Sequence, residues 1–373
     1  MASPLGAFRS SSGGLRTTGG PRVSRKDRIV QSTDTDALSS KYSAYKKGYL
    51  ADPYLEAIVS GFLVQEQQHY HGRGTHSAGQ FVNKMPIINI GSCVRHLAVT
   101  RLVDLFLEST EKCQIISLGA GSDTRPFSLL AKYNKQTAAS DNAADVKLIY
   151  HELDFAVTTT KKALTIFNSP LLSDVIYHAS PRPQTPPGAE IHTPDYHLHA
   201  ADLRTLNATT PLLPGMDPTL PTLVISECCL CYLQPDESDQ VFSFLVTNFG
   251  HAGLGMILYE PIGGNDAFGQ VMVENLATRG ISLPTLQRFP TLQAEVHRLA
   301  DRGMGVPRAA DMMYIYERWI SREEKQRISR LEFLDELEEL RLLLSHYCVA
   351  WTVTPNSPAA WVDAYETQLP YQV

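Results

Sequence analysis

Cysteine is scarce in this sequence, with six residues in a chain of 373. Disulfide scaffolds are short and cysteine-dense, so that class of secreted protein is excluded. Long hydrophobic runs are also missing, because no stretch of about eighteen apolar residues is present to span a bilayer. We therefore expect a cytoplasmic protein in a reducing compartment, with no membrane partner.

An excess of basic residues is missing as well, since the formal net charge is -6. A protein whose main partner is nucleic acid needs a basic surface, so no nucleic-acid partner is expected, and only a local basic groove stays open as an alternative. Hydrophobic residues make up 43% of the chain and charged residues 19%, which is typical of globular proteins. The length is sufficient to bury an enzyme-sized core, as one large domain or two.

Residues 1–27 differ from the rest and are predicted to form a disordered tail, because Ser, Gly and Pro dominate them and apolar periodicity is nearly absent. The first 26 contain five basic residues and no acidic one. A transit peptide is therefore the alternative, although Gly13-Gly14 and Gly19-Gly20 would interrupt the amphipathic helix that it needs.

The hydrophobic period changes along the remaining chain. Residues 34–110 place apolar side chains at helical spacing and predict helices. From residue 113 onward, short apolar runs alternate with segments long enough for helices, which predicts an α/β doubly wound sheet. The expected strands are 113–118, 146–155, 175–178, 196–201, 222–233, 255–262 and 342–353. Helices are expected around 271–278, 292–299 and 308–321, and loops at 67–84 and 132–146.

A glycine turn follows the first expected strand. Gly119 and Gly121 would let backbone approach a ligand closely at the carboxyl end of the strand, where open α/β sheets bind ligands. Thr124 stands where a dinucleotide fingerprint has its third glycine, so access for a pyrophosphate is poor. A tight turn without a ligand stays open as the alternative.

Two carboxylates are expected at the same edge of the sheet. Asp154 ends the second strand, where a carboxylate can accept both hydroxyls of a ribose. Glu227 follows another apolar run, at 223–225. Because the carboxyl ends of parallel strands meet at one edge, both acids should lie near the glycine turn.

Metal binding is not predicted. Cys228 and Cys231 form a C-x-x-C without a second pair, so buried packing is favoured over a zinc or redox site. His69, His71 and His76 have no acid or cysteine at ligand spacing, and we interpret them as solvated loop residues.

Taken together, the motifs of this chain resemble those of the eukaryotic leucine carboxyl methyltransferases, from about residue 32 to the C-terminus. The matching motifs are Lys41 in SSKY, Arg95 in NIGSCVR, LGAGSDTR at 118–125, Asp154, ADLR at 201–204, Ser226-Glu227 through Tyr232, and YEP at 259–261. Each is common by itself, whereas their order and spacing are specific.

The resemblance implies a class I S-adenosylmethionine-dependent methyltransferase with a Rossmann-like doubly wound sheet. Its single domain, 28–373, would contain a helical cap at 28–112, a cofactor-binding core at 113–262, an inserted helical lid at 263–330, and a C-terminal helix and strands at 331–373. The implied reaction methylates the α-carboxylate of the C-terminal leucine of the protein phosphatase 2A catalytic subunit and so regulates phosphatase assembly. Both the tail and the folded surface of that partner would contribute to binding.

The resemblance also implies a role for each matching residue. Lys41 and Arg95 would hold the methionine carboxylate of the cofactor, Gly119 its amino acid part, Asp154 the ribose hydroxyls, Asp202 with Leu203 the adenine, and Glu227 the amino group. Tyr232 would face the transferable methyl group as the catalytic residue, and no metal is implied. Lys41 could instead be an ordinary solvated charge on the first helix.

Two other functions stay open. An enzyme of the same fold could methylate a small carboxylic acid, and a chain without turnover could bind the phosphatase. The presence of Asp154, Asp202 and Glu227 disfavours the second, which cofactor binding would test.

Overall fold

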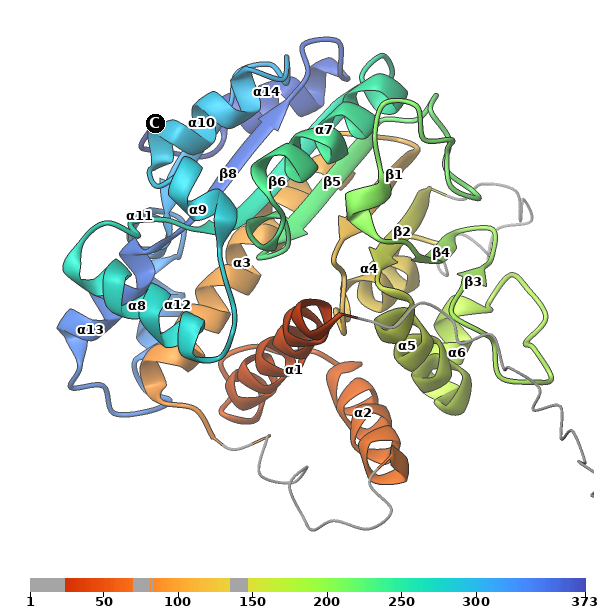
Figure 1. Ribbon diagram of the computed structural model, residues 1–373, viewed down its shortest axis with the longest axis horizontal. Coiled ribbons are helices and arrows are strands. Elements are labelled where there is room, and N and C mark those ends of the chain that lie inside the picture. Colours follow the sequence, from red (N-terminus) through yellow and green to blue (C-terminus); the bar gives the residue numbers. More distant parts are fainter. Residues whose placement is uncertain (1–23, 70–80, 82, 135–146) are drawn as a thin grey trace, which may run out of the picture.

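The computed structural model describes residues 24–69, 81, 83–134 and 147–373 (Figure 1). Within them, eight strands form one sheet in the order β3-β4-β2-β1-β5-β6-β8-β7. The strands are β1 Cys113–Leu118, β2 Leu148–Asp154, β3 Ile191–His192, β4 Tyr196–Ala200, β5 Thr222–Glu227, β6 Leu254–Pro261, β7 Arg308–Asp311 and β8 Tyr347–Val353. The strands from β4 to β6 in this order run parallel, whereas β3 and β8 are antiparallel to their neighbours.

Helices cover both faces of the sheet, as the doubly wound prediction requires (Figure 1). They are α1 Arg25–Lys46, α2 Leu55–His69, α3 Pro86–Glu108, α4 Arg125–Tyr133, α5 Ala156–Asn168, α6 Pro170–Ile176, α7 Pro235–Phe249, α8 Ala267–Thr278, α9 Pro284–Arg288, α10 Leu292–Ala300, α11 Met312–Arg318, α12 Arg322–Ile328, α13 Leu337–Ser345 and α14 Ala359–Thr367. Short 3-10 turns, η2 at Leu203–Thr205 and η3 at Leu230–Tyr232, follow β4 and β5.

The hydrophobic core has two parts, one on each face of the sheet, because successive side chains of a strand point to opposite faces. On β1, Ile115 packs into the cluster that α3, α4, α5 and α14 share, whereas Ile116 packs on the opposite face, against α7 and α10. Both faces of these strands must therefore be apolar. This explains why the central strands read as continuous apolar runs.

Three expected elements are wrong or misplaced. The expected strand 175–178 is the end of helix α6, because Ser169 accepts a hydrogen bond from the Leu172 amide and Pro170 occupies the first turn. The expected helix 308–321 begins with β7, which pairs with β8, and becomes helical only at Met312, after the capping residue Asp311. The lid at 263–330 is therefore not wholly helical.

Other boundaries also move. The strand expected at 342–353 begins at Tyr347, and the apolar residues before it belong to α13, so the C-terminal part contains two helices and one strand. The strand expected at 222–233 ends at Glu227. Strand β3 was not expected, because it has only two residues.

Most residues of the predicted tail lie outside the described residues, but α1 already begins at Arg25, with Ser24 as its cap. Helix α2 extends through His69 into the expected loop 67–84, and the expected loop 132–146 begins inside α4. His71 and His76 lie outside the described residues. The helices expected within 34–110 are confirmed by α1, α2 and α3.

Helices α1 and α2 lie beyond the carboxyl ends of the central strands (Figure 1). Among the helices of the described residues, none combines the length with the apolar character that crossing a bilayer requires.

Candidate active site

A cavity of about 490 Å³ lies at the carboxyl edge of the sheet. Its wall comes from the ends of β1, β2, β4 and β5 and from the helices α1, α3, α8 and α13. All eight residues predicted from the sequence line it, namely Lys41, Arg95, Gly119, Asp154, Asp202, Leu203, Glu227 and Tyr232. The topology thus brings together residues that are up to 191 positions apart in the chain.

The turn after β1 requires its two glycines. Gly119 and Gly121 have φ angles of 58° and 50°, in the left-handed region that side chains with a Cβ rarely adopt. A Cβ on Gly119 would also collide with the thiol of Cys229, and one on Gly121 would collide with the carboxylate of Asp34. Backbone therefore forms this part of the cavity wall.

Asp154 connects the end of β2 to the glycine turn. One carboxylate oxygen accepts a hydrogen bond of 2.8 Å from the Gly121 amide, and the other accepts one of 2.7 Å from the Phe155 amide. Burial raises the pKa of Asp154 to about 6, although both amides favour the charged form. The Thr158 side chain also hydrogen-bonds this carboxylate, so about one of its four acceptor positions is left for a ligand.

Asp154→Ala should weaken a ribose-containing ligand, here S-adenosylmethionine, by at least about tenfold. Charge-assisted hydrogen bonds contribute about 1.5 to 3 kcal/mol each, and about 1.4 kcal/mol corresponds to one decade. Because the pKa of Asp154 is raised to about 6, the affinity of the unmodified protein should be constant above that pH and fall below it. Titration calorimetry between pH 5 and 8 measures both effects.

Asp236→Ala provides the control for that measurement, since it removes an exposed carboxylate from the first turn of α7. It should leave the affinity unchanged. If the Asp154→Ala protein keeps its fold and binds S-adenosylmethionine as tightly as the control, Asp154 does not contact the ligand.

Glu227 lies between two guanidinium groups at the end of β5. It accepts hydrogen bonds from Nε of Arg95 at 2.7 Å and from an Nη of Arg125 at 2.8 Å. Burial alone would raise the pKa of Glu227, but the two guanidiniums lower it, so this carboxylate is charged. The cavity therefore contains a partly buried carboxylate with a guanidinium on each side.

Arg125 is a site residue without a role in the sequence analysis, although it ends the quoted turn motif. It also donates to Asp123 at 2.7 Å, and its Nε is buried without a hydrogen-bond partner among the described residues. Its position as the first residue of α4, directly after the glycine turn, could have indicated a role in the site.

Lys41 is held inside the site rather than in solvent, which argues against an ordinary solvated charge. Its ammonium lies 2.9 Å from the Asp52 carboxylate and donates to the Thr124 hydroxyl at 2.5 Å. Thr124 in turn donates to Asp52. The helical cap is thereby joined to the glycine turn.

Asp202 and Leu203 follow β4 at the other end of the cavity. Both oxygens of Asp202 accept from the guanidinium of Arg204, at 2.9 and 2.6 Å. Arg204 also donates to Asp27 of α1 at 2.8 Å. With its carboxylate occupied in this way, Asp202 fixes the backbone of η2, and Leu203 presents an apolar surface.

Tyr232 ends η3 and forms part of the wall beneath α1. Burial raises the pKa of its hydroxyl, which therefore stays protonated and can donate a hydrogen bond. Cys228, four residues earlier, has a φ of 49° and is the one non-glycine residue with positive φ among those described. This backbone conformation is unfavourable for a cysteine, and such conformations concentrate at functional sites.

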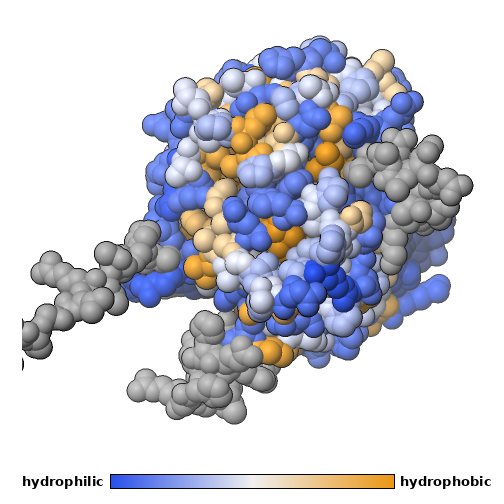
Figure 2. Space-filling view, turned by 90° about the vertical axis from the view of Figure 1, so that its right-hand side faces the viewer, coloured by the Kyte–Doolittle hydropathy of each residue, from blue (hydrophilic) through white to orange (hydrophobic). Residues whose placement is uncertain are grey.

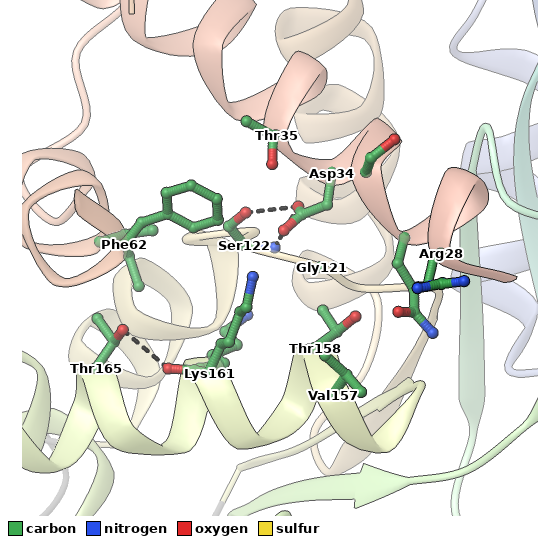
Figure 3. Close-up of a pocket in the computed structure, with 14 residues that line it drawn as sticks. Arg28, Asp34, Thr35, Phe62, Gly121, Ser122, Val157, Thr158, Lys161 and Thr165 are labelled. Atoms are coloured by element: carbon green, nitrogen blue, oxygen red, sulfur yellow. Dashed lines mark hydrogen bonds between the residues drawn. The ribbon is translucent and has the colours of Figure 1, made fainter. Parts of the chain in front are cut away.

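A second cavity of about 240 Å³ adjoins the first and is enclosed by α1, α2 and α5 (Figure 3). Asp34 points from α1 into the boundary between them, where it accepts from the Ser122 amide at 2.8 Å and from the Ser122 hydroxyl at 2.5 Å. Arg28 and Lys161 line the second cavity. The sequence offered no signal for Asp34, because a single acid on a helix is usually solvated.

All six cysteines are free. Cys228 lines the larger cavity, and Cys231 is buried directly behind it in η3.

The chain is similar to known proteins over most of its length. Residues 29–246 match the family described as leucine carboxyl methyltransferase. Leucine carboxyl methyltransferase 1 of Yarrowia lipolytica is 46% identical over 330 residues, which cover 88% of this chain and 97% of that protein. Leucine carboxyl methyltransferase 1 of Aspergillus fumigatus is 43% identical over 379 residues, covering 94% of this chain and 89% of that protein.

Solved structures of low sequence identity are also similar. The geranyl diphosphate C-methyltransferase of Streptomyces coelicolor, in complex with S-adenosylhomocysteine, is 10% identical, with a TM-score of 0.38 over 82% of this chain and 98% of that chain.

Proposed function

Since this chain belongs to the leucine carboxyl methyltransferase family, we propose that it methylates the α-carboxylate of the C-terminal leucine of the protein phosphatase 2A catalytic subunit. Its fold is that of the class I methyltransferases, and its cofactor is S-adenosylmethionine. The product would be a leucine methyl ester, and removal of the terminal charge would regulate phosphatase assembly.

The arrangement around Glu227 carries this proposal. The amino acid part of the cofactor has an ammonium and a carboxylate next to each other, and this part of the cavity offers an acid between two guanidiniums. We assign the ammonium to Glu227 and the cofactor carboxylate to Arg95 and Lys41, with the Gly119 backbone beside them. These donors and acceptors fit the charges of the cofactor.

The rest of the cavity fits the nucleoside. Asp154 can accept from a ribose hydroxyl, and Leu203 offers an apolar contact for adenine beside the backbone that Asp202 fixes. When bound, S-adenosylmethionine supplies a methyl group on a positively charged sulfur.

The reaction forms an oxygen–methyl bond as the sulfur–methyl bond breaks, and its products are the methyl ester and S-adenosylhomocysteine. An α-carboxyl has an ordinary pKa of about 3.3 to 3.7, so at neutral pH it is already a nucleophile and needs no general base. What the protein must supply is alignment of the reacting atoms and exclusion of water, since charge is lost along the reaction path.

Tyr232 is proposed to aim the acceptor carboxylate. Its protonated hydroxyl can donate one hydrogen bond to that carboxylate, and its ring excludes water from the wall. Arg125 is proposed to hold Glu227 and would not itself touch the acceptor.

Mass spectrometry of the phosphatase catalytic subunit, after incubation with this protein and S-adenosylmethionine, tests the proposal. One methyl group should appear on the C-terminal leucine. A subunit that lacks the leucine, or a tail peptide amidated at its end, should remain unmodified, because neither presents the α-carboxylate at the methyl group.

Methylation of the amidated peptide, or of an internal aspartate or glutamate, would show that the acceptor is wrong. Turnover with small carboxylic acids but not with the subunit would support the same-fold alternative. Cofactor binding without any turnover would support a non-catalytic phosphatase-binding protein. A free tail peptide that reacts more slowly than the subunit would indicate that folded surface contributes to binding.

A cytoplasmic location is part of the proposal. Six unpaired cysteines fit a reducing compartment, in which a phosphatase tail would be accessible.

A further inference from the structure

A cluster of four histidines lies at the β3–β4 edge of the sheet, and none of them lines the cavity described above. His151 on β2 pairs in register with His197 on β4, so their side chains share one face, and His199 lies two residues further along that face. The rings of His151 and His197 stack with centroids 4.8 Å apart. His192 on β3 faces both β4 rings, at 5.4 and 5.3 Å.

Glu190, directly before β3, completes a possible set of metal ligands. One carboxylate oxygen of Glu190 and one ring nitrogen each of His192 and His199 lie within 4.8 Å of one another. The Glu190 carboxylate lies 3.7 Å from Nε2 of His192. Two imidazoles and one carboxylate are a ligand set that first-row divalent metals such as zinc accept, with open positions filled by water.

One ring nitrogen of each candidate histidine ligand lies within hydrogen-bond distance of another histidine. Nδ1 of His192 lies 3.2 Å from a nitrogen of His197, and Nε2 of His199 lies 3.1 Å from Nδ1 of His151. Metal-binding histidines almost always make such a second hydrogen bond, which fixes the ring orientation and the tautomer. His151 and His197 would therefore act as orienting residues.

The remaining nitrogen of His199 has no hydrogen-bond partner among the described residues, although the residue is only 1% exposed. An unsatisfied buried polar atom is costly, so its position needs an explanation. If Nε2 of His199 donates to His151, then Nδ1 carries a bare lone pair, which is what a metal ligand presents.

The other two groups give an ion access from solvent. The side chains of His192 and Glu190 are 34% and 49% exposed. Figure 2 shows the side of the molecule on which this edge of the sheet lies, and most of its surface is hydrophilic.

We propose that Glu190, His192 and His199 bind a divalent transition-metal ion of the zinc type. The ion would connect the two-residue strand β3 to β4, which continues into Asp202 and Leu203 at the cavity. Its expected effect is on the stability of this edge of the sheet, because the site lies outside the cavity and the proposed methyl transfer needs no metal.

Zinc titration of the full chain without a histidine tag, in competition with a chromophoric chelator, tests the proposal. One zinc equivalent should bind, and His192→Ala and Glu190→Gln should each weaken it by at least about tenfold. His251→Ala removes an exposed imidazole elsewhere and should not change the affinity. Zinc should also raise the melting temperature of the unmodified protein, but not that of the two ligand variants.

Absence of saturable zinc binding would overturn the proposal. So would an unchanged affinity in both His192→Ala and Glu190→Gln. If the double variant His71→Ala/His76→Ala loses zinc while His192→Ala retains it, the ion binds to those histidines instead, and the proposed site is wrong.

Discussion

Glu227→Gln is expected to weaken binding of S-adenosylmethionine by about a hundredfold. The substitution keeps the shape of the side chain but removes the charge between Arg95 and Arg125. A hydrogen bond between charged groups, here the cofactor ammonium and Glu227, contributes about 1.5 to 3 kcal/mol, and about 1.4 kcal/mol corresponds to one decade. The cofactor ammonium would also lose its charged acceptor and lie beside the Arg95 guanidinium without Glu227 between them, whereas Arg125 keeps its ion pair with Asp123.

Titration calorimetry with S-adenosylmethionine measures this effect. Glu237→Gln is the matched control, because Glu237 lines the same cavity and its side chain accepts from the Gln234 backbone, a role that glutamine also fills. The control should bind within about twofold of the unmodified protein. Equal affinity in both variants would show that the ammonium is not held by Glu227.

Lys162→Met is expected to lower the free energy of unfolding by about 3 to 5 kcal/mol at pH 8, since it leaves a buried carboxylate without its partner. The Lys162 ammonium donates to Glu152 at 2.6 Å and to the Asp123 carbonyl at 2.7 Å, and both side chains of the ion pair are almost fully buried. The Tyr196 hydroxyl also donates to Glu152. Methionine fills a similar volume, so little of the loss would come from a cavity.

The loss should be smaller at pH 5.5. Burial raises the pKa of Glu152 from 4.5 to about 7, and Lys162 opposes that shift. When the pKa of a carboxyl is higher in the folded than in the unfolded protein, the free energy of unfolding falls as the pH rises from the unfolded-state pKa to the folded-state pKa. Without Lys162 the folded-state pKa of Glu152 rises further, so the free energy of unfolding of the variant continues to fall at higher pH.

Urea unfolding at both pH values measures the difference. Lys132→Met, on the exposed side of α4, makes the same replacement at a surface lysine and should change stability by no more than about 0.5 kcal/mol. A Lys162→Met protein as stable as this control at pH 8 would show that the ion pair contributes nothing to the fold.

The sequence was sufficient to predict the central sheet because its strands are buried on both faces and end in residues that sequence reasoning can interpret. Gly119, Asp154 and Glu227 each follow an apolar run, and parallel strands place such ends at one edge. The expected strand at 175–178 failed because Val175 and Ile176 are apolar in both interpretations, and only the cap at Ser169 distinguishes them. The hydropathy pattern around residues 308–311 does not predict β7, because these four residues form a strand only through their pairing with β8.

Contacts between segments distant in the sequence also limited the prediction of the site. Arg125 and Asp34 join the site through partners 102 and 88 residues away, and a single sequence does not show such pairings. The histidine cluster has the same origin, since His151 meets His197 and His199 only because β2 pairs with β4. Its members were invisible as a group in the linear sequence.

Helix α1 determines which fragments of this protein can be studied by themselves. It contacts the turn after β1 through Asp34, Arg204 of η2 through Asp27, and the capping residue of α4, Thr124, through Lys41. A shortened protein that begins at β1 would therefore lack both a wall of the cavity and a buried acid that fixes Ser122. The smallest unit suitable for crystallising a cofactor complex or for screening ligands includes α1.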